Sequence, residues 1–341
     1  MNDLPDFYEF SPDQRRTSIE LDDLYDSWVV AARQTRKGRL RWKTVNGTDY
    51  LYRLRYGQDT GESLGRRSKD NEALYAAGQE WERREEETWR RLLVRGRMAK
   101  AARLPVLHDF AGRLLREIDR AGLLGEDVLV IGSMALLAYE MAAGVKLPPD
   151  LLATEDFDMA WIGHDHPPPA RLTDAIKRAD SSWTISQEKT FQARNRAGYS
   201  LDLVIAPELE SDYPKNETLR ALPIAGQSFL LGGVPVRHVV PDSLGKPACI
   251  VAPDPRLFAL HKLWLSRQPD RVATKRKKDA QQAYDLLTLV DRHLPEYPLD
   301  SDFQNELPAP LAVLLDEWRT TTTPPSSKAV PPSTKKSKTR F

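Results

Sequence analysis

The sequence has a single cysteine, no long apolar run and almost no net charge, and each of these absences excludes a class of protein. Cys249 has no second cysteine to pair with among the 341 residues. A lone free thiol favours a reducing compartment over secretion. No stretch approaches the roughly 20 apolar residues that span a bilayer, and the polar start of the chain lacks a secretory signal pattern. We therefore expect a cytoplasmic protein without a membrane partner.

The charge balance excludes a molecule that attracts nucleic acid over its whole surface. Fifty lysines and arginines stand against forty-nine aspartates and glutamates, which leaves a formal charge of +1. Any attraction to an anionic partner must therefore come from local patches. The sequence also lacks a Cys/His zinc pattern, a Gly-x-x-x-x-Gly-Lys phosphate loop, a nucleophile elbow and a repeat of fixed period. Its 40% hydrophobic content is enough for an ordinary globular core.

The order of the patterns predicts a mixed α/β (α+β) chain with helical additions on both sides. Helical spacing covers about 12–37, and alternation around Asn46-Gly47 indicates a β-hairpin. A charged, proline-free stretch over 69–103 predicts a long, largely solvated helix. The expected parts are an N-terminal helix and hairpin region (1–103), a mixed-sheet core (104–240), a C-terminal helical region (241–319) and a disordered basic tail rich in Thr, Pro, Ser and Lys (320–341).

Within the core, the first candidate site is a turn between an apolar strand and a helix. The strand starting at Val128 runs into Gly132-Ser133, and a helix is predicted from Met134 to Met141. Gly132 would allow backbone amides to approach a ligand, and the Ser133 hydroxyl and helix N-terminus could donate to phosphate oxygens. Taken alone, such a turn is more often only a turn with an N-cap.

Two aspartates provide the second candidate, because they occupy alternate positions of a predicted strand. Asp156 and Asp158 would share one face while Phe157 and Met159 pack behind. Neighbouring carboxylates repel each other, and protonation or a bound cation relieves the repulsion. An Asp-x-Asp in a loop is usually only surface acid, but these neighbours are apolar.

A third aspartate, Asp202, interrupts the otherwise apolar run from Tyr199 to Ala206. Burying such an acid is costly unless it is paired or binds a metal. The segment Phe191–Asn195 is expected to be the antiparallel partner strand across an Arg-Ala-Gly turn. The alternative is an edge-strand aspartate that faces water.

Together these elements resemble the DNA polymerase beta-like nucleotidyltransferase superfamily over about 104–240. The resemblance implies that Asp156, Asp158 and Asp202 bind two Mg²⁺ ions, or Mn²⁺ in their place, and that Gly132 and Ser133 hold the triphosphate of an NTP substrate. It implies transfer of a nucleoside monophosphate to an acceptor hydroxyl on RNA such as tRNA, on protein or on a small molecule. The stretch 134–155, longer than is usual in the superfamily, could displace the turn from the carboxylates.

The flanking regions carry weaker resemblances. Tyr50-Leu51-Tyr52 with 63–68 is similar to an uncharacterised bacterial nucleotidyltransferase subfamily. His261-Lys262-Leu263-Trp264 with Arg267, followed by 278–283, resembles the helical region of abortive-infection-type nucleotidyltransferase toxins.

Several basic and aromatic residues outside the three aspartates could bind a ligand. Lys262 and Arg267 could reach nucleotide phosphates, although cations near a helix end are equally explained by the helix dipole. The run 275–278 could bind an RNA backbone. A face formed by Tyr50, Tyr52 and Tyr56 could stack bases, although aromatic hairpin faces more often belong to a core.

Two other functions remain open at this stage. One is a non-catalytic module that keeps the fold and binds RNA or protein. The other is the toxin of a toxin–antitoxin or phage-defence pair, an enzyme that differs in its acceptor.

Overall fold

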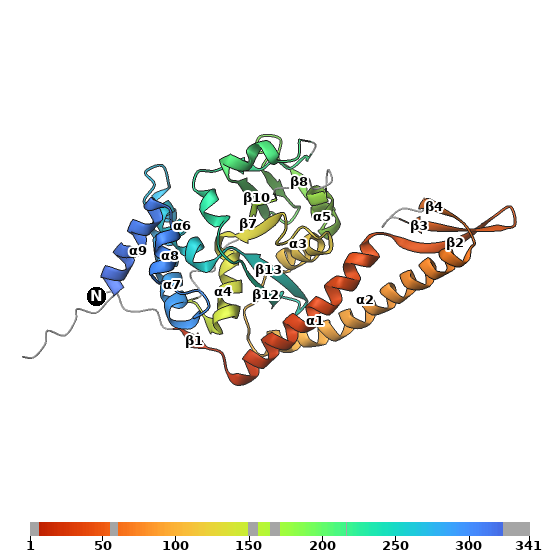
Figure 1. Cartoon of the computed structure of the whole chain (residues 1–341), viewed down its shortest axis with the longest axis horizontal. Coiled ribbons are helices and arrows are strands. Elements are labelled where there is room, and N and C mark those ends of the chain that lie inside the picture. Colours follow the sequence, from red (N-terminus) through yellow and green to blue (C-terminus); the bar gives the residue numbers. More distant parts are fainter. Residues whose placement is uncertain (1–6, 55–60, 149–155, 164–170, 216, 323–341) are drawn as a thin grey trace, which may run out of the picture.

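The structure is a computed structural model of the chain, and it shows three parts side by side: a long arm, an α/β core and a group of C-terminal helices (Figure 1). Helices combined with a mixed sheet confirm the expected α/β (α+β) fold class. None of the helices within the described part of the chain is both long and apolar enough to cross a membrane. The described residues are 7–54, 61–148, 156–163, 171–215 and 217–322.

The arm consists of two long helices that pack against each other and carry a small antiparallel sheet at their far end (Figure 1). Each helix begins at a serine, Ser11 or Ser68, whose side chain accepts a hydrogen bond from a backbone amide of the first turn. The expected helices and hairpin are confirmed, and a third strand, which lacks alternation in the sequence, joins them. The elements are α1 (Pro12–Arg36), β2 (Arg39–Val45), β3 (Thr48–Leu54), β4 (Gly61–Arg66) and α2 (Lys69–Ala101).

The core is built on a mixed sheet in which β7 and β10 are parallel central neighbours. Strand β5 pairs antiparallel with β7, and β9 pairs antiparallel with β10 across the expected Arg196-Ala197-Gly198 turn. The order is β5-β7-β10-β9-β8, and β11 pairs with the end of β10. The strands are β5 (Val128–Ile131), β7 (Asp156–Trp161), β8 (Thr184–Ile185), β9 (Gln192–Arg194), β10 (Ser200–Ile205) and β11 (Leu222–Pro223).

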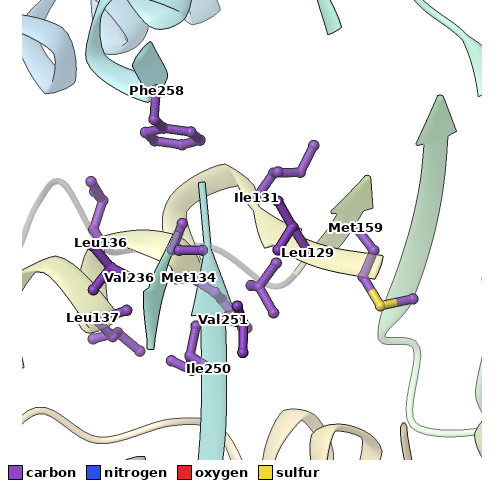
Figure 2. Packing of buried hydrophobic residues seen from close by; sticks show 14 of the residues in the cluster. Leu129, Ile131, Met134, Leu136, Leu137, Met159, Val236, Ile250, Val251 and Phe258 are labelled. Atoms are coloured by element: carbon purple, nitrogen blue, oxygen red, sulfur yellow. The ribbon is translucent and has the colours of Figure 1, made fainter. Parts of the chain in front are cut away.

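Helices and a second hairpin pack around this sheet. Figure 2 shows apolar side chains of β5, β7, α4 and the β12–β13 hairpin in one buried cluster together with Phe258. The expected core boundary at residue 240 falls inside this hairpin, which pairs through to residue 252. The elements are α3 (Asp109–Arg120), α4 (Ala135–Ala143), α5 (Arg171–Ala179), β12 (Val236–Pro241), β13 (Pro247–Ala252), and the small antiparallel pair β1 (Tyr8–Glu9) and β6 (Val145–Lys146).

The arm is fixed to the core at its root by charged side chains. Arg33 of α1 pairs with the buried Asp119 of α3 at 2.7 Å. Asp22 accepts a hydrogen bond from the Val239 amide of β12 at 2.7 Å and contacts His238 at 2.9 Å. These contacts join α1 to two elements of the core, α3 and β12, and so attach the root of the arm to the core.

The C-terminal part contains the two expected helices and two that the sequence patterns did not predict. Asp254 caps the first of them, and Pro255 follows at its first position. The last helix takes in Thr320–Thr322, so the start of the expected tail is wrong by three residues, and 323–341 lie outside the described residues. The helices are α6 (Pro255–Ser266), α7 (Ala273–His293), α8 (Ser301–Glu306) and α9 (Ala309–Thr322).

Candidate active site

The pairing of β7 with β10 brings the three aspartates onto one face of the sheet. Asp202 lies directly opposite Asp158, and Ser200 lies opposite Asp156, in a parallel register. Register partners point to the same side, and residues two apart on one strand do so as well. The opposite side chains, Phe157 among them, are buried in the core, as expected. Asp202 is therefore no edge-strand residue, because β10 is paired on both sides.

The glycine turn lies against this carboxylate face. Gly132 has a positive φ of 68°, and a Cβ built on it would stand 2.2 Å from Asp158 Oδ2. Ile131, the preceding residue, is the antiparallel register partner of Asp158. The long stretch 134–155 therefore does not displace the turn from the carboxylates.

The carboxyl group of Asp158 has a raised pKa. The pKa of its carboxyl is raised to about 6, chiefly by removal from water; Lys262 and Lys275 oppose the shift, and the neighbouring Asp202 and Asp156 add to it. A carboxylate that is desolvated beside two others is stabilised by an added cation. Asp158 is thus the position where positive charge is most favourable.

The other two carboxylates are held by polar neighbours on the sheet. The Ser200 hydroxyl donates to Asp156 Oδ1 at 2.5 Å, and the Gln192 side-chain amide donates to Asp202 Oδ1 at 2.7 Å. No three Asp, Glu, His or Cys side chains within the described ranges are already arranged to hold a metal ion. In this structure Asp156 and Asp202 are thus each held by a polar side chain of the sheet.

Cations from the C-terminal helices face the carboxylates. Lys262 of α6 is buried and donates to Asp279 at 2.9 Å, and Arg271 binds the other oxygen of Asp279. Burial lowers the pKa of Lys278, with Lys262 and Lys275 lowering it further while Asp279 and Asp158 raise it. Helices α6 and α7 thus bring the ammonium groups of Lys262, Lys275 and Lys278 within electrostatic range of Asp158.

Ser133 and Arg267 have partners that bear on their expected roles. Ser133 Oγ accepts a hydrogen bond from the Gln282 side chain of α7 at 3.2 Å and makes no capping bond to its own helical turn. Arg267 lies at the C-terminal end of α6 and pairs with Glu317 of α9 at 2.8 Å. Its contact with phosphate stays a prediction, and its observed position is also the one that the helix dipole favours.

Comparison with known proteins agrees with this geometry. A nucleotidyltransferase family model matches residues 109–308, which is more than half of the chain and includes the turn, the three aspartates and Lys262. The chain belongs to the nucleotidyltransferase family. No curated protein and no solved structure matches it.

Some polar residues around the carboxylates of this nucleotidyltransferase were not predicted as site residues. Gln192 is the clearest case, because it contacts Asp202 directly. The sequence does indicate this contact. A turn at 196–198 pairs Ser200 with Arg194, so the residues two positions further from the turn, Asp202 and Gln192, are also paired. The approach of Lys275 to Asp158 had no such signal, because it depends on how α7 packs onto the core.

The residues of the nucleotidyltransferase core fit a divalent cation. Carboxylate oxygens are the protein ligands that Mg²⁺ prefers, and it is commonly held by one or two carboxylates together with substrate phosphates. Asp156, Asp158 and Asp202 supply this donor type on one face, and the absence of a Cβ at Gly132 leaves room for the Asp158 carboxylate.

Proposed function

We propose that this nucleotidyltransferase moves a nucleoside monophosphate from an NTP to an acceptor hydroxyl in a cation-dependent reaction. The observation that carries the proposal is the register of Asp202 with Asp158 beside the Gly132 turn. The three carboxylates share one face of the sheet beside the Gly132 turn, and lysines of α6 and α7 lie within electrostatic range of Asp158. The raised pKa of Asp158 supports the proposal, because strongly perturbed pKa values cluster at functional sites.

In this proposal Asp156, Asp158 and Asp202 would hold two Mg²⁺ ions, or Mn²⁺ in their place. When bound, such cations lower the pKa of an attacking hydroxyl and neutralise charge on transferring phosphates. The pKa of about 6 at Asp158 means that cation binding would displace its proton. Affinity for the cation should therefore increase as the pH rises through 6.

The triphosphate would lie between the turn and the start of α7. Gly132 and Ser133 would offer donors on one side, and Lys262, Lys275 and Lys278 would offer ammonium groups on the other. Helix α7 has no acid in its first turn and carries basic residues over 275–278, where its dipole already favours anions and disfavours cations. Helix stability does not explain this placement, whereas binding of phosphate does.

The reaction forms one bond and breaks one. The acceptor oxygen attacks the α-phosphorus of the NTP, and the bond from this phosphorus to the oxygen bridging the β-phosphate breaks. Pyrophosphate leaves with the bonding electron pair. The acceptor proton passes to a carboxylate, for which we assign Asp202, and the hydrogen bond from Gln192 holds this carboxylate in place.

The test is incubation of the purified chain with each α-labelled NTP and with total RNA or a protein extract. The proposal predicts label in a macromolecule with Mg²⁺ or Mn²⁺ and none with EDTA. A non-catalytic RNA-binding or protein-binding module predicts no transfer under any of these conditions. The proposal would be contradicted if none of the four NTPs labelled either extract and none of them shifted the melting temperature of the protein.

A toxin role is a narrower hypothesis about the same chemistry. It rests on the similarity of 261–267 and 278–283 to abortive-infection-type nucleotidyltransferase toxins. The electrostatic influence of Lys262 and Lys278 on Asp158 supports a shared site. Expression should then arrest growth, and Asp156→Asn should relieve the arrest; unimpaired growth on expression of the active enzyme would contradict the toxin role.

A further inference from the structure

The three-stranded sheet at the end of the arm has two faces of different chemistry. Strand alternation and the pairing of β2 with β3 decide which side chains share a face: Trp42 lies opposite Leu51, and Lys43 lies opposite Tyr50. The tyrosines therefore do not share a face with Trp42, which is a residue of the other side.

The inner face packs on α2. Leu51 is fully buried, Trp42 lies against Tyr75 of α2 with ring centroids 5.8 Å apart, and Leu40 contacts α2 at Gly78. Among the described residues, this face supplies the fully buried side chain of the sheet and its ring contact with α2. The aromatic residues of the other face are therefore not needed for a core.

The outer face presents tyrosines and cations. Lys43 and Arg66 are exposed, and each lies over a half-buried ring: the Lys43 ammonium is 5.2 Å from the Tyr52 centroid, and the Arg66 guanidinium is 5.9 Å from that of Tyr50. Arg41, opposite Tyr52, belongs to this face by register, but it pairs with Glu82 of α2 at 3.2 Å and adds no net charge.

The carboxylates of the sheet lie on the opposite side. Among the described positions of the three strands, the acids are Asp49 and Glu62, whose register partners are Thr44 and Arg53 of the inner face. Among the described positions of the three strands, the outer face thus carries cations and no acid, although the whole chain has a charge of only +1. Such an asymmetry is complementary to a polyanion.

We propose that this outer face binds a single-stranded nucleic acid, with bases stacked on Tyr50 and Tyr52 and phosphates contacted by Lys43 and Arg66. Aromatic rings flanked by cations are the usual platform for unpaired bases, since every base has a flat face to stack and every nucleotide a phosphate. A duplex offers phosphates but keeps its bases inside, so it would use only the cations.

This inference rests on the proposed function in one respect, because it identifies the acceptor as a nucleic acid held by the arm. The sheet lies at the far end of α1 and α2 from the helices that carry Lys262 and Lys275 (Figure 1). The arm would therefore bind an acceptor strand at a point distant from the hydroxyl that reacts. Binding can then be measured without NTP and separated from chemistry.

The experiment is fluorescence anisotropy with the full chain in EDTA without NTP. The probes are a labelled mixed-sequence 20-nucleotide RNA, the same sequence as DNA, and the RNA annealed to its complement. Tyr50→Ala with Tyr52→Ala removes the rings, and Lys43→Ala with Arg66→Ala removes the cations. The matched control is Arg16→Ala with Arg90→Ala, two exposed cations of the arm that pair only along their own helices.

We expect the wild-type chain to bind the single strand more tightly than the duplex. Loss of the rings should weaken single-strand affinity by about tenfold or more while sparing duplex affinity. Loss of the two cations should reduce the slope of log affinity against log salt by about 1.4. The control should change neither quantity, and circular dichroism should show that every variant keeps its helices.

RNA bound more tightly than DNA identifies RNA as the acceptor class, and the reverse result identifies DNA. Absence of single-strand binding by the wild-type chain would overturn the inference, as would single-strand binding that survives loss of the rings. A chain that transfers nucleotides but binds no probe therefore contradicts only this inference, whereas a chain that binds the probe but never transfers contradicts only the proposed function.

Discussion

Gly132 and Asp158 lie so close together that a single methyl group on the glycine would occupy the space of the carboxylate. The virtual Cβ stands 2.2 Å from Asp158 Oδ2, and φ at Gly132 is 68°. A turn and an aspartate that are far apart in the sequence are therefore parts of one site, and only glycine satisfies both the backbone and the space.

Gly132→Ala should disable the site because the added methyl group must push Asp158 away. We expect nucleotide binding and transfer to fall by at least about tenfold, and unfolding free energy to fall by about 1–3 kcal/mol from backbone strain and displacement. Binding is measured by titration with Mg²⁺ and NTP, and stability by urea unfolding.

The matched control is Gly198→Ala, which also has a positive φ but no atom within 4 Å of its virtual Cβ. It should cost only the strain of the backbone, about 1 kcal/mol, and leave nucleotide affinity unchanged. Equal losses of affinity in the two variants would show that contact with Asp158 is unimportant.

Lys262→Met should separate a structural role from a role in binding phosphate. The change removes the hydrogen bond from Lys262 to the buried Asp279 and leaves that from Arg271, so we expect the unfolding free energy to fall by about 1–3 kcal/mol. NTP affinity should fall about tenfold. Adding Asp279→Asn should restore part of the stability but none of the affinity.

Arg267→Ala provides the comparison for that experiment. The pair with Glu317 is exposed, so its loss should cost under about 1 kcal/mol. If Arg267→Ala retains NTP affinity, Arg267 only stabilises the end of the helix. If it loses as much affinity as Lys262→Met, Arg267 also contacts the phosphates.

The pKa of Asp158 gives a pH dependence with a definite sign. Its folded-state pKa is raised to about 6 from 3.8, so the folded protein holds this proton more tightly than the unfolded chain between these values. Stability contributed by this group is therefore present below about pH 4, is lost as the pH rises to about 6, and stays lost above that.

Asp158→Asn removes this titration, so the metal-free variant should exceed wild type in unfolding free energy by about 1–3 kcal/mol at pH 7.5. The difference should shrink toward zero near pH 4. Urea unfolding in EDTA at both pH values measures it, with the exposed Asp291→Asn as control. A variant less stable than wild type at pH 7.5 would contradict this account of the electrostatics.

The main strands and their faces could be predicted because alternation is a local property of the sequence. Asp156 and Asp158 occupy alternate positions of a strand, and the turn at 196–198 sets the pairing that includes Asp202. Strand β4 was missed because Gly61–Arg66 has little apolar alternation, and the backbone of β3 pairs with it regardless.

Contacts between distant elements could not be predicted in the same way. The approach of Gly132 to Asp158 depends on β5 pairing beside β7, and that of Lys275 depends on how α7 packs. The two faces of the arm sheet show the same limit: the sequence indicates a tyrosine face, but only α2 decides which face is covered. Tyr56, the third expected tyrosine, lies outside the described residues.

Removal of residues 323–341 should leave stability unchanged. The segment is rich in Thr, Pro, Ser and Lys and has too few apolar residues to offset the entropy of ordering. The cut must follow Thr322, because Trp318 of α9 is buried. Thermal unfolding of the shortened chain tests this, and a fall of many degrees in Tm would show that the segment packs.

The most direct test of the central claim is the rate of nucleotidyl transfer by Asp158→Asn, measured with the NTP and acceptor that wild type uses at saturating Mg²⁺. The substitution keeps the shape of the side chain and removes the carboxylate that lies opposite Asp202 and against Gly132. We predict that transfer falls by at least about a hundredfold, while Asp291→Asn retains the wild-type rate. Transfer by Asp158→Asn at a rate near that of wild type would contradict the three-carboxylate mechanism.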